Sequence, residues 1–262
     1  MAGADRPLIL LSNDDGHASR GIRALRLALL DVADVILVAP ESEQSAASHA
    51  LSLHRPLRAR EAEPGIFAVD GTPADCVYVA LNAGTRFLEK KPSLVVSGIN
   101  HGLNLGQDVF YSGTVAAARE GALRRIPSLA VSAHPHADFA KVATLATMLA
   151  QSMMARNRRT PAPLLNLNVP KTWNGEIRRT RLGERIYEQG VEFRTDPRGR
   201  EYIWLGGSHV RHERNDGTDT DAYDDGAASI TPLCLDLTHM DDDAYAEAIA
   251  QDVRGTPEGA HA

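Results

Sequence analysis

Short runs of consecutive apolar residues, separated by segments of helical periodicity, are the feature that most constrains the fold of this chain. Five such runs lie within residues 8–11, 35–39, 66–69, 94–96 and 128–131, and residues 165–169, where apolar residues alternate with asparagine, indicate a further strand. Strands that are apolar throughout are buried on both faces, as in a parallel sheet covered by helices. Right-handed crossovers between such strands wind the chain in both directions. The pattern therefore predicts an α/β fold with a doubly wound, Rossmann-like and mostly parallel sheet.

The segments between the apolar runs favour helices. Apolar residues recur at helical spacing over 22–32. A second helix is predicted over 72–81, where Thr72 can cap a helix that has a proline in its first turn. Further helices are expected over 114–125 and 139–154.

The last third of the chain is more polar and has a different pattern. The turn signal Asp196–Gly199 precedes residues 201–205, which are predicted to form one arm of a hairpin. Strand pieces are expected at 229–230 and 233–237, and a final helix is expected to begin at 241–243. Hairpins that project from an α/β core often pair with another subunit, so a homo-oligomer, a dimer or a tetramer, is predicted.

These patterns indicate one α/β domain over residues 1–262. Its core is expected over about 7–170, and a β-hairpin and helix extension used in oligomerisation is expected over about 171–262. The acidic run 216–226 resembles a calcium loop, but an EF-hand needs an oxygen ligand where Tyr223 stands. We therefore interpret this run as a polar connection.

Composition and charge exclude several classes of protein. Of the 262 residues, 43% are hydrophobic and 24% are charged, so disorder as the main state is excluded. A net charge of −6 disfavours long-range attraction to nucleic acid or to an anionic membrane, and neither is expected as a partner. Residues 8–11 are too short for a signal-peptide core, so a cytoplasmic protein is predicted. Cys76 and Cys234, each in an apolar stretch, are predicted to be buried free thiols.

Polar groups follow the predicted strands, at the edge where ligands bind in doubly wound sheets. Asp14 and Asp15 are adjacent acids at the end of the first strand. A cation would relieve their repulsion, and oxygen-only surroundings suit Mg²⁺ or Mn²⁺ better than zinc. The alternative is a simple turn, because Asn and Asp side chains bond local backbone N–H groups.

A second candidate is the glycine-rich loop 98–106 and the helix that follows it. The loop lacks the phosphate-loop and dinucleotide fingerprints. The segment Tyr111-Ser112-Gly113-Thr114 opens an alanine-rich helix, and a helix N-terminus with two hydroxyls can cradle a phosphate. The alternative is that Ser112 or Thr114 is only an N-cap. Together, a divalent metal beside an anion-binding helix end would support metal-assisted phosphoryl hydrolysis.

Six short motifs in this order resemble the survival protein SurE family of 5′/3′-nucleotidases. They are Asn13-Asp-Asp-Gly16, Ala39-Pro40 followed by Ser45, Gly71-Thr-Pro-Ala-Asp-Cys76, Val96-Ser-Gly-Ile-Asn100, Asn104-Leu-Gly106 and Tyr111-Ser-Gly-Thr-Val115. The resemblance is clear from Leu8 to about Val131. It resumes weakly at 165–170, 217–219 and 229–232.

The resemblance implies a divalent-metal-dependent phosphatase that hydrolyses nucleoside 5′- and 3′-monophosphates, and in some members also short polyphosphate. It implies one metal ion per subunit, Mg²⁺ or Mn²⁺, held by four residues: Asp14, Asp15, Ser45 and Asn100. It also implies a phosphate-binding side formed by Asn104, Ser112, Gly113 and Thr114. Asp14 is the better candidate to accept a proton from the attacking water. The family exchanges parts of its C-terminal region between subunits.

The chain departs from the family pattern at two places. Arg20 stands where the family usually has proline, and Glu43 and Gln44 stand where Arg or Asn is common. Neither change removes an expected metal ligand. His101 lies in the candidate loop and could act as an acid or a phosphate contact. Two other readings remain open: a non-catalytic metal- and nucleotide-binding regulator on the same fold, and a metal-dependent deacetylase, which usually has His ligands.

Overall fold

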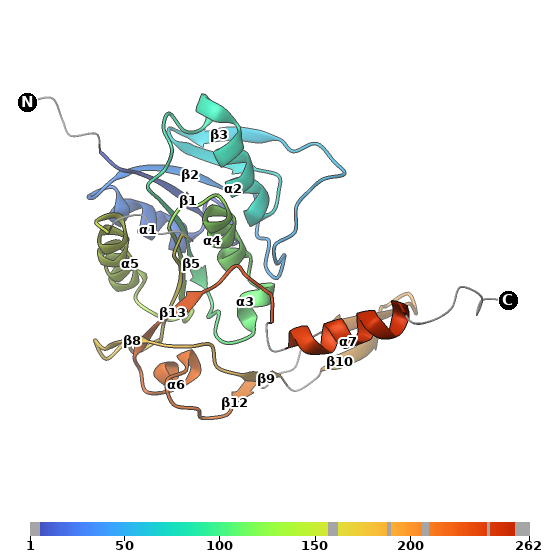
Figure 1. The fold of residues 1–262 in the computed structure, drawn as a ribbon. Helices are drawn as coiled ribbons and strands as arrows, with labels where there is room; N and C mark the ends of the chain where they lie inside the picture. The colour runs from blue at the N-terminus through green and yellow to red at the C-terminus, as the bar shows by residue number, and fades with distance from the viewer. Residues whose placement is uncertain (1–5, 157–161, 188–189, 206–209, 240–241, 255–262) are drawn as a thin grey trace, which may run out of the picture.

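A nine-stranded mixed sheet forms the centre of the molecule in the computed structural model, which describes residues 6–156, 162–187, 190–205, 210–239 and 242–254 (Figure 1). The strand order is β3-β4-β2-β1-β5-β6-β7-β13-β8. The strands are β1 Leu8–Ser12, β2 Asp34–Pro40, β3 Ala59–Glu63, β4 Ile66–Val69, β5 Leu94–His101, β6 Ser128–Ala133, β7 Leu164–Val169, β8 Ile177–Arg179 and β13 Ala228–Leu233. Within this sheet, as far as the chain is described, only the pairs β3/β4 and β7/β13 are antiparallel, so the predicted mostly parallel α/β sheet is confirmed.

Helices cover both faces of the sheet, as the apolar strands require. Helices α1 (Arg20–Leu29) and α5 (Phe139–Met154) pack together on one face, and α2 (Pro73–Asn82) and α4 (Gly113–Leu123) on the other. From β1 the chain winds outward through β2 and β4, then returns to pair β5 on the other side of β1. This reversal between β1 and β5 is the switch point where ligands bind in doubly wound sheets.

Strand β1 shows how the sequence pattern builds this core. All five of its residues are buried. Ile9 and Leu11 pack with α1 and α5, whereas Leu8 and Leu10 pack with α2, because successive side chains point to opposite faces of a strand. A continuous apolar run is therefore needed here to fill two cores at once.

Local signals begin the helices where the sequence indicates. The Thr72 side chain accepts from the backbone N–H of Asp75, and the Asp75 carboxylate accepts from the N–H of Thr72, which forms a capping box. Ser112 caps α4 by accepting from the N–H of Val115 at 3.0 Å. The expected helix over 139–154 is confirmed as α5.

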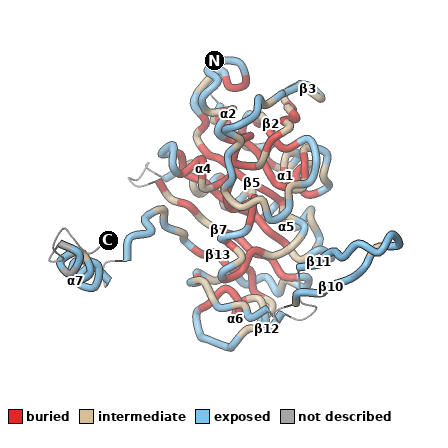
Figure 2. Tube along the Cα trace, turned by 90° about the vertical axis from the view of Figure 1, so that its right-hand side faces the viewer, coloured by how far each residue is buried: buried red, intermediate tan, exposed pale blue. Residues whose placement is uncertain are grey.

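The C-terminal part adds small elements beside the sheet and two that project from it. They are β9 Arg185–Tyr187, β10 Val191–Thr195, β11 Glu201–Leu205, β12 Val210–His212, α6 Asp219–Asp224 and α7 Asp243–Arg254. Strands β9 and β12 form a short ribbon, and β10 pairs with β11 in the predicted hairpin. Figure 2 shows this hairpin and α7 as exposed segments that extend away from the buried sheet.

Several expectations for individual segments need correction. Strand β5 continues to His101, so Asn100 lies on a strand and not in a loop. Strand β13 ends at Leu233, and the rest of the expected strand 233–237 is irregular. Cys76 is a buried free thiol as predicted, but Cys234 is exposed because it follows the end of that strand.

Several short elements have no counterpart in the prediction, among them the strands β8, β9 and β12. The acidic run read as a polar connection contains helix α6, whose first residues are buried. The edge strand β3, the single-turn helix α3 (Asp108–Tyr111) and the 3₁₀ turn η1 (Gly84–Arg86) were also not expected. The expected first residue of the final helix, 241, lies outside the described residues. Among those described, no helix is both long and apolar enough to cross a bilayer.

Candidate functional site

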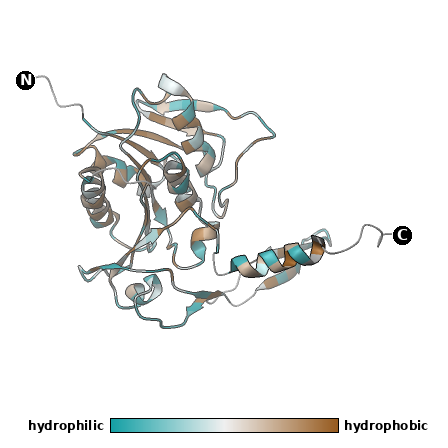
Figure 3. Cartoon of the chain, in the orientation of Figure 1, coloured by the Kyte–Doolittle hydropathy of each residue, from teal (hydrophilic) through white to brown (hydrophobic). Residues whose placement is uncertain are grey.

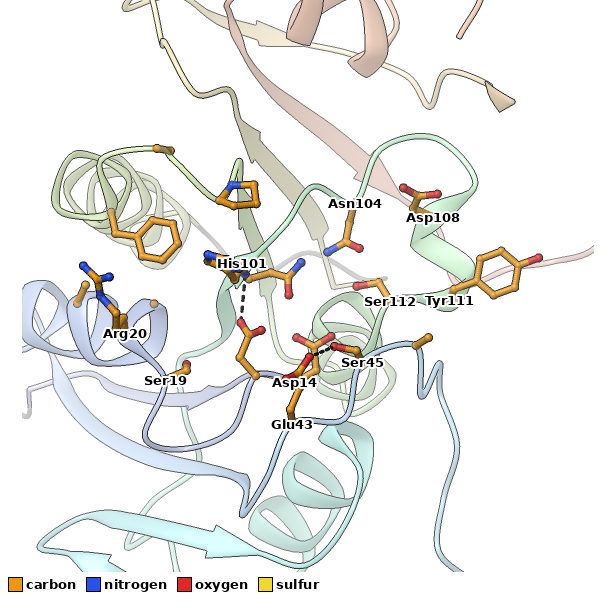
Figure 4. A pocket seen from close by; sticks show the side chains of 18 of the residues that line it. Asp14, Ser19, Arg20, Glu43, Ser45, His101, Asn104, Asp108, Tyr111 and Ser112 are labelled. Carbon is orange, nitrogen blue, oxygen red and sulfur yellow. Dashed lines mark hydrogen bonds between the residues drawn. The ribbon is translucent and has the colours of Figure 1, made fainter. Parts of the chain in front are cut away.

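One open cavity of about 1260 Å³ lies at the carboxyl ends of the central strands, at the switch point of the sheet. Six of the eight predicted site residues line it: Asp14, Asp15, Ser45, Asn100, Asn104 and Ser112. They come from the loops after β1 and β2, from β5, and from the segment that leads into α4. Figure 4 shows the side chains of Asp14, Ser45, Asn104 and Ser112 around one space. Parallel strand order, not sequence proximity, brings them together.

Asp14 is the most buried carboxylate of the cavity lining. It is 5% exposed, and burial raises the pKa of its carboxyl group above the usual value. The Thr114 hydroxyl donates to its Oδ1. This bond leaves Oδ2 as the atom available to a ligand.

Asp15 lies beside Asp14 and is less buried. Burial, followed by the negative charge of Asp14, raises the pKa of Asp15 to about 6. Its Oδ2 accepts from the backbone N–H of His101 at 3.1 Å, which ties the loop after β1 to the end of β5. The turn itself is made by Asn13, whose Nδ2 donates to the Gly16 carbonyl at 3.0 Å and to Ser19 Oγ at 2.9 Å. Asn13 therefore stabilises the turn, and the carboxylates of Asp14 and Asp15 are not needed for it.

Ser45 and Asn100 complete the set of oxygen groups expected to hold a metal. The Ser45 hydroxyl donates to Glu43 Oε1 at 2.7 Å, so its oxygen lone pairs are available on the other side. Asn100 Nδ2 donates to the Gly102 carbonyl at 3.0 Å, which leaves the amide oxygen as the group for a ligand. Glu43 also lines the cavity, and its charge raises the pKa of both Asp14 and Asp15.

Asn104 is held rigidly by groups that the sequence prediction did not identify. Its backbone N–H donates to Asn168 Oδ1 at 2.8 Å, and its carbonyl accepts from Asn166 Nδ2 at 2.8 Å and Asn168 Nδ2 at 3.0 Å. Its own Nδ2 donates to Ser132 Oγ at 2.8 Å. Asn166 and Asn168 lie two residues apart on β7 and share a face. Two buried asparagines in an otherwise apolar strand were the signal that could have revealed this role.

The other three residues predicted to bind phosphate differ in whether they reach the cavity. Ser112 lines the cavity and also caps α4, so the cap and the ligand contact are compatible. Gly113 and Thr114 do not line it. Thr114 is fully buried behind Asp14. A Cβ on Gly113 would come within 2.8 Å of Asp14 Cβ and 2.9 Å of Pro73 Cγ, so only glycine lets α4 begin against Asp14.

The chemistry of the donor set fits a hard divalent cation. Two carboxylates, one hydroxyl and one amide oxygen are the ligand types that Mg²⁺ and Mn²⁺ take, with water in the remaining positions. Burial first, and neighbouring negative charge second, raise the pKa of both aspartates, and a bound cation would favour their ionised form. Within the described part of the chain, no group of three or more His, Cys, Asp or Glu side chains is arranged to hold a metal.

Other residues of the cavity lining were missed or only partly recognised from the sequence. Arg20 and His101 lie on one flank in Figure 4. Phe139 also lines the cavity, and its ring is edge to face with that of His101 at 6.1 Å. Tyr187 and Leu205 of the C-terminal part also line the cavity. Their spacing in the sequence gives no indication of this convergence.

The fold and this cavity define an α/β protein whose switch-point site is lined by carboxylate, amide and hydroxyl groups. The profile of the family described as Survival protein SurE matches residues 9–189. This chain belongs to that family.

Individual relatives cover nearly the whole chain. The chain is 56% identical to a protein of Sorangium cellulosum (strain So ce56) named 5′-nucleotidase SurE, in a match that covers 96% of this chain and 99% of the other. It is 49% identical to a protein of the same name from Myxococcus xanthus (strain DK1622), and that match covers 88% of each chain. A crystal structure of the SurE protein from Aquifex aeolicus superimposes with a TM-score of 0.79 at 36% identity, covering 93% of this chain and 100% of the other.

Proposed function

We propose that this chain is a 5′-nucleotidase that releases phosphate from nucleoside monophosphates with the help of one divalent cation, Mg²⁺ or Mn²⁺. The observation that carries the proposal is one cavity that holds both the Asp14–Asp15 pair and the Ser112-capped start of α4. Relatives of 46–56% identity that cover most of the chain are named 5′-nucleotidase SurE, which supports this substrate class.

Four residues would hold the cation: Asp14, Asp15, Ser45 and Asn100. When bound, the cation supplies a Lewis acid for the phosphoryl group and lowers the pKa of a bound water. The two carboxylates must be ionised to bind it, because a protonated carboxyl is a poor ligand. Glu43 accepts a hydrogen bond from the Ser45 hydroxyl, which leaves the lone pairs of the Ser45 oxygen available to the cation.

Side chains of the protein would then orient the phosphoryl group and the attacking water. Asn104 and Ser112 would donate to the phosphoryl oxygens, and the rigid support of Asn104 by β7 keeps that donor in place during the reaction. Asp14, whose Oδ1 accepts from the Thr114 hydroxyl, would also accept the proton of the attacking water. Burial of Asp14 favours this role because it raises the affinity of the carboxylate for a proton.

The breadth of the substrate range is part of the proposal. A cavity of about 1260 Å³ exceeds the ~300–1,000 Å³ usual for small ligands, so it has space for a nucleoside beyond the phosphoryl group. We extend the proposal to nucleoside 3′-monophosphates and to short polyphosphate, which present the same terminal phosphoryl group.

Phosphate release from 5′- and 3′-nucleotides, with Mn²⁺, Mg²⁺ or EDTA, tests this function. The wild type should release phosphate only with metal, and Asp14→Asn should lower kcat by about 10³-fold or more. Asp31→Asn, an exposed aspartate after α1, is the matched control and should stay within about twofold. Release that persists in EDTA, or equal rates for the two variants, would contradict the proposal. A folded wild type that binds Mn²⁺ but hydrolyses no nucleotide would favour the non-catalytic regulator.

We also propose that the chain works as a homo-oligomer, a dimer or a tetramer, assembled through the C-terminal part. Alternation along the β10–β11 hairpin places four apolar side chains on one face: Val191, Phe193, Ile203 and Leu205. All four are more than half exposed in the single chain. Helix α7 carries three further exposed side chains spaced four residues apart, Tyr245, Ile249 and Val253. Figure 3 shows hydrophobic and hydrophilic positions interspersed along this helix. A second copy of the chain would cover both surfaces.

A further inference from the structure

The phosphate-side loop, residues 104–112, is attached to the C-terminal part of the chain by a buried carboxylate. Asp219, the first residue of α6, is fully buried. Its Oδ2 accepts from the backbone N–H of Gly106 at 3.0 Å, and its Oδ1 accepts from the N–H of Gly183 at 2.7 Å. Two chain segments that are far apart in the sequence are therefore joined through one side chain.

The two segments also pack directly against each other at Gly106 and Gly183, where there is no space for a side chain. Gly106 has φ +52°, and a Cβ on it would lie 2.5 Å from the Gly183 carbonyl oxygen. Any side chain at position 106 must therefore push the loop away from Gly183. The φ value adds strain of its own for any other residue.

Further bonds hold the same loop from the same side. Asp108 accepts from the Arg185 guanidinium and from the Tyr187 hydroxyl. The N–H of Arg185 donates to Gln107 Oε1 at 2.7 Å. The Asp108 carbonyl in turn accepts from the N–H of Ser112 at 3.0 Å, so the constraint reaches the start of α4.

We propose that Asp219 is a positioning residue for the reaction: by holding Gly106 against Gly183 it sets where Asn104 and Ser112 present their donors to the phosphoryl group. This inference rests on the proposed nucleotidase function. Asn104 is two residues before Gly106 and is fixed on its other side by β7, so the loop is held between two rigid supports. Asp219 itself does not line the cavity, so a substrate bound there would not touch it.

The test compares Asp219→Asn with Asp221→Asn. Asp221 is a second buried aspartate on α6, and its bond is to the N–H of Asn215, away from the loop. Asparagine at 219 keeps one acceptor but presents an NH₂ group to the other backbone N–H. Loss of one charge-assisted hydrogen bond predicts a fall in kcat of about tenfold to a hundredfold for Asp219→Asn. Binding of orthovanadate, a mimic of the reacting phosphoryl group, should weaken by a similar factor.

Other readouts separate positioning from general damage. The KM of Asp219→Asn should change less than its kcat, and its Mn²⁺ affinity by calorimetry should equal the wild-type value, because the expected metal ligands lie on other elements. Asp221→Asn should stay within about twofold of wild type in kcat. Gly106→Ala, which leaves Asp219 intact but separates the loop from Gly183, should reproduce the loss of kcat and of vanadate binding if Asp219→Asn does not fold.

The inference is overturned if Asp219→Asn and Asp221→Asn have the same kcat and vanadate affinity. It is also overturned if Asp219→Asn loses Mn²⁺ binding in parallel with activity, since that result indicates collapse of the whole site. Absence of activity in the wild type is a different result: it contradicts the proposed function and leaves vanadate binding to judge the role of Asp219.

Discussion

The sheet and the projecting hairpin use the same residue types in opposite environments. Valine, isoleucine and leucine fill β1, β5 and β6, where they are almost completely buried between two helical layers. The same types on β10 and β11 stand in solvent, with Leu205 at 82% exposure (Figure 2). An isolated two-stranded hairpin is at best marginally stable in water. The comparison indicates that the sheet is complete within one chain and that the hairpin needs a surface that the single chain does not supply.

The two regions also differ in what they contribute to the cavity. The loops after β1 and β2, together with β5, bring the candidate metal ligands, whereas the C-terminal part brings Asp219 as a support and Tyr187 and Leu205 as lining. The candidate metal ligands therefore lie at the sheet edge, whereas the C-terminal part helps to position the loop 104–112.

The largest expected difference between the regions is in stability. Leu10→Ala opens a hole in a fully buried strand and should cost about 2–5 kcal/mol of unfolding free energy. Leu205→Ala removes the same atoms from the hairpin and should change the stability of the dilute single chain by less than about 0.5 kcal/mol. Urea unfolding at low protein concentration measures both. A large loss for Leu205→Ala would show that the hairpin packs on its own core.

The second prediction concerns assembly. Phe193→Ser on the apolar hairpin face should raise the dissociation constant of the oligomer by about thirtyfold or more, because large buried aromatics dominate interfaces. Tyr202→Ser lies on the opposite face of the same hairpin and is the matched control. Sedimentation velocity over a dilution series reports both. Equal dissociation constants for the two variants would remove the hairpin face from the interface.

The third prediction is a pH dependence of the metal-free protein. The pKa of Asp15 is raised to about 6 in the folded chain from an unfolded value of 3.8, so the folded state binds more protons between these values. Stability should therefore fall as pH rises from about 4 to about 6, by on the order of 1 kcal/mol once solvent screening is allowed for.

Thermal melts of wild type and Asp15→Asn across this pH range measure that term. The variant should lack the part of the decline that belongs to Asp15, and added Mn²⁺ should abolish the decline in the wild type. Identical pH profiles for the two metal-free proteins would show that the pKa of Asp15 is not raised in the folded chain.

The smallest predicted effect tests the capping box of α2, on the sheet side of the comparison. Thr72→Ala removes the acceptor for the N–H of Asp75 and should cost about 1 kcal/mol. Thr144→Ala, whose exposed hydroxyl bonds only within α5, should be nearly neutral. Chemical denaturation distinguishes the two. A neutral Thr72→Ala would show that tertiary packing alone sets the start of α2.

The sequence predicted best what depends on local periodicity. Apolar runs located the strands of the sheet, and the cap and proline at Thr72 and Pro73 located α2. The adjacent acids after β1 and the hydroxyls before α4 identified one edge, since parallel strands deliver their carboxyl ends to the same side.

What the sequence did not reveal depends on contacts between distant segments. The support of Asn104 by Asn168 and of Gly106 by Asp219 joins residues 64 and 113 positions apart, and no local pattern encodes such pairs. The hydroxyl of Thr114 at the start of a helix suggested a phosphate contact. Its side chain instead bonds to Asp14, because it lies on the buried side of α4. Cys234 was wrongly predicted to be buried because apolar neighbours continue past the true end of β13.

The central claim is that the switch-point edge holds one divalent cation next to the phosphate-side loop. Anomalous diffraction from crystals grown with Mn²⁺ and orthovanadate tests it most directly. The account predicts one manganese peak within coordination distance of Asp14, Asp15, Ser45 and Asn100, with vanadate between it and Ser112. A manganese peak elsewhere, or vanadate bound at this edge without the metal, would contradict it.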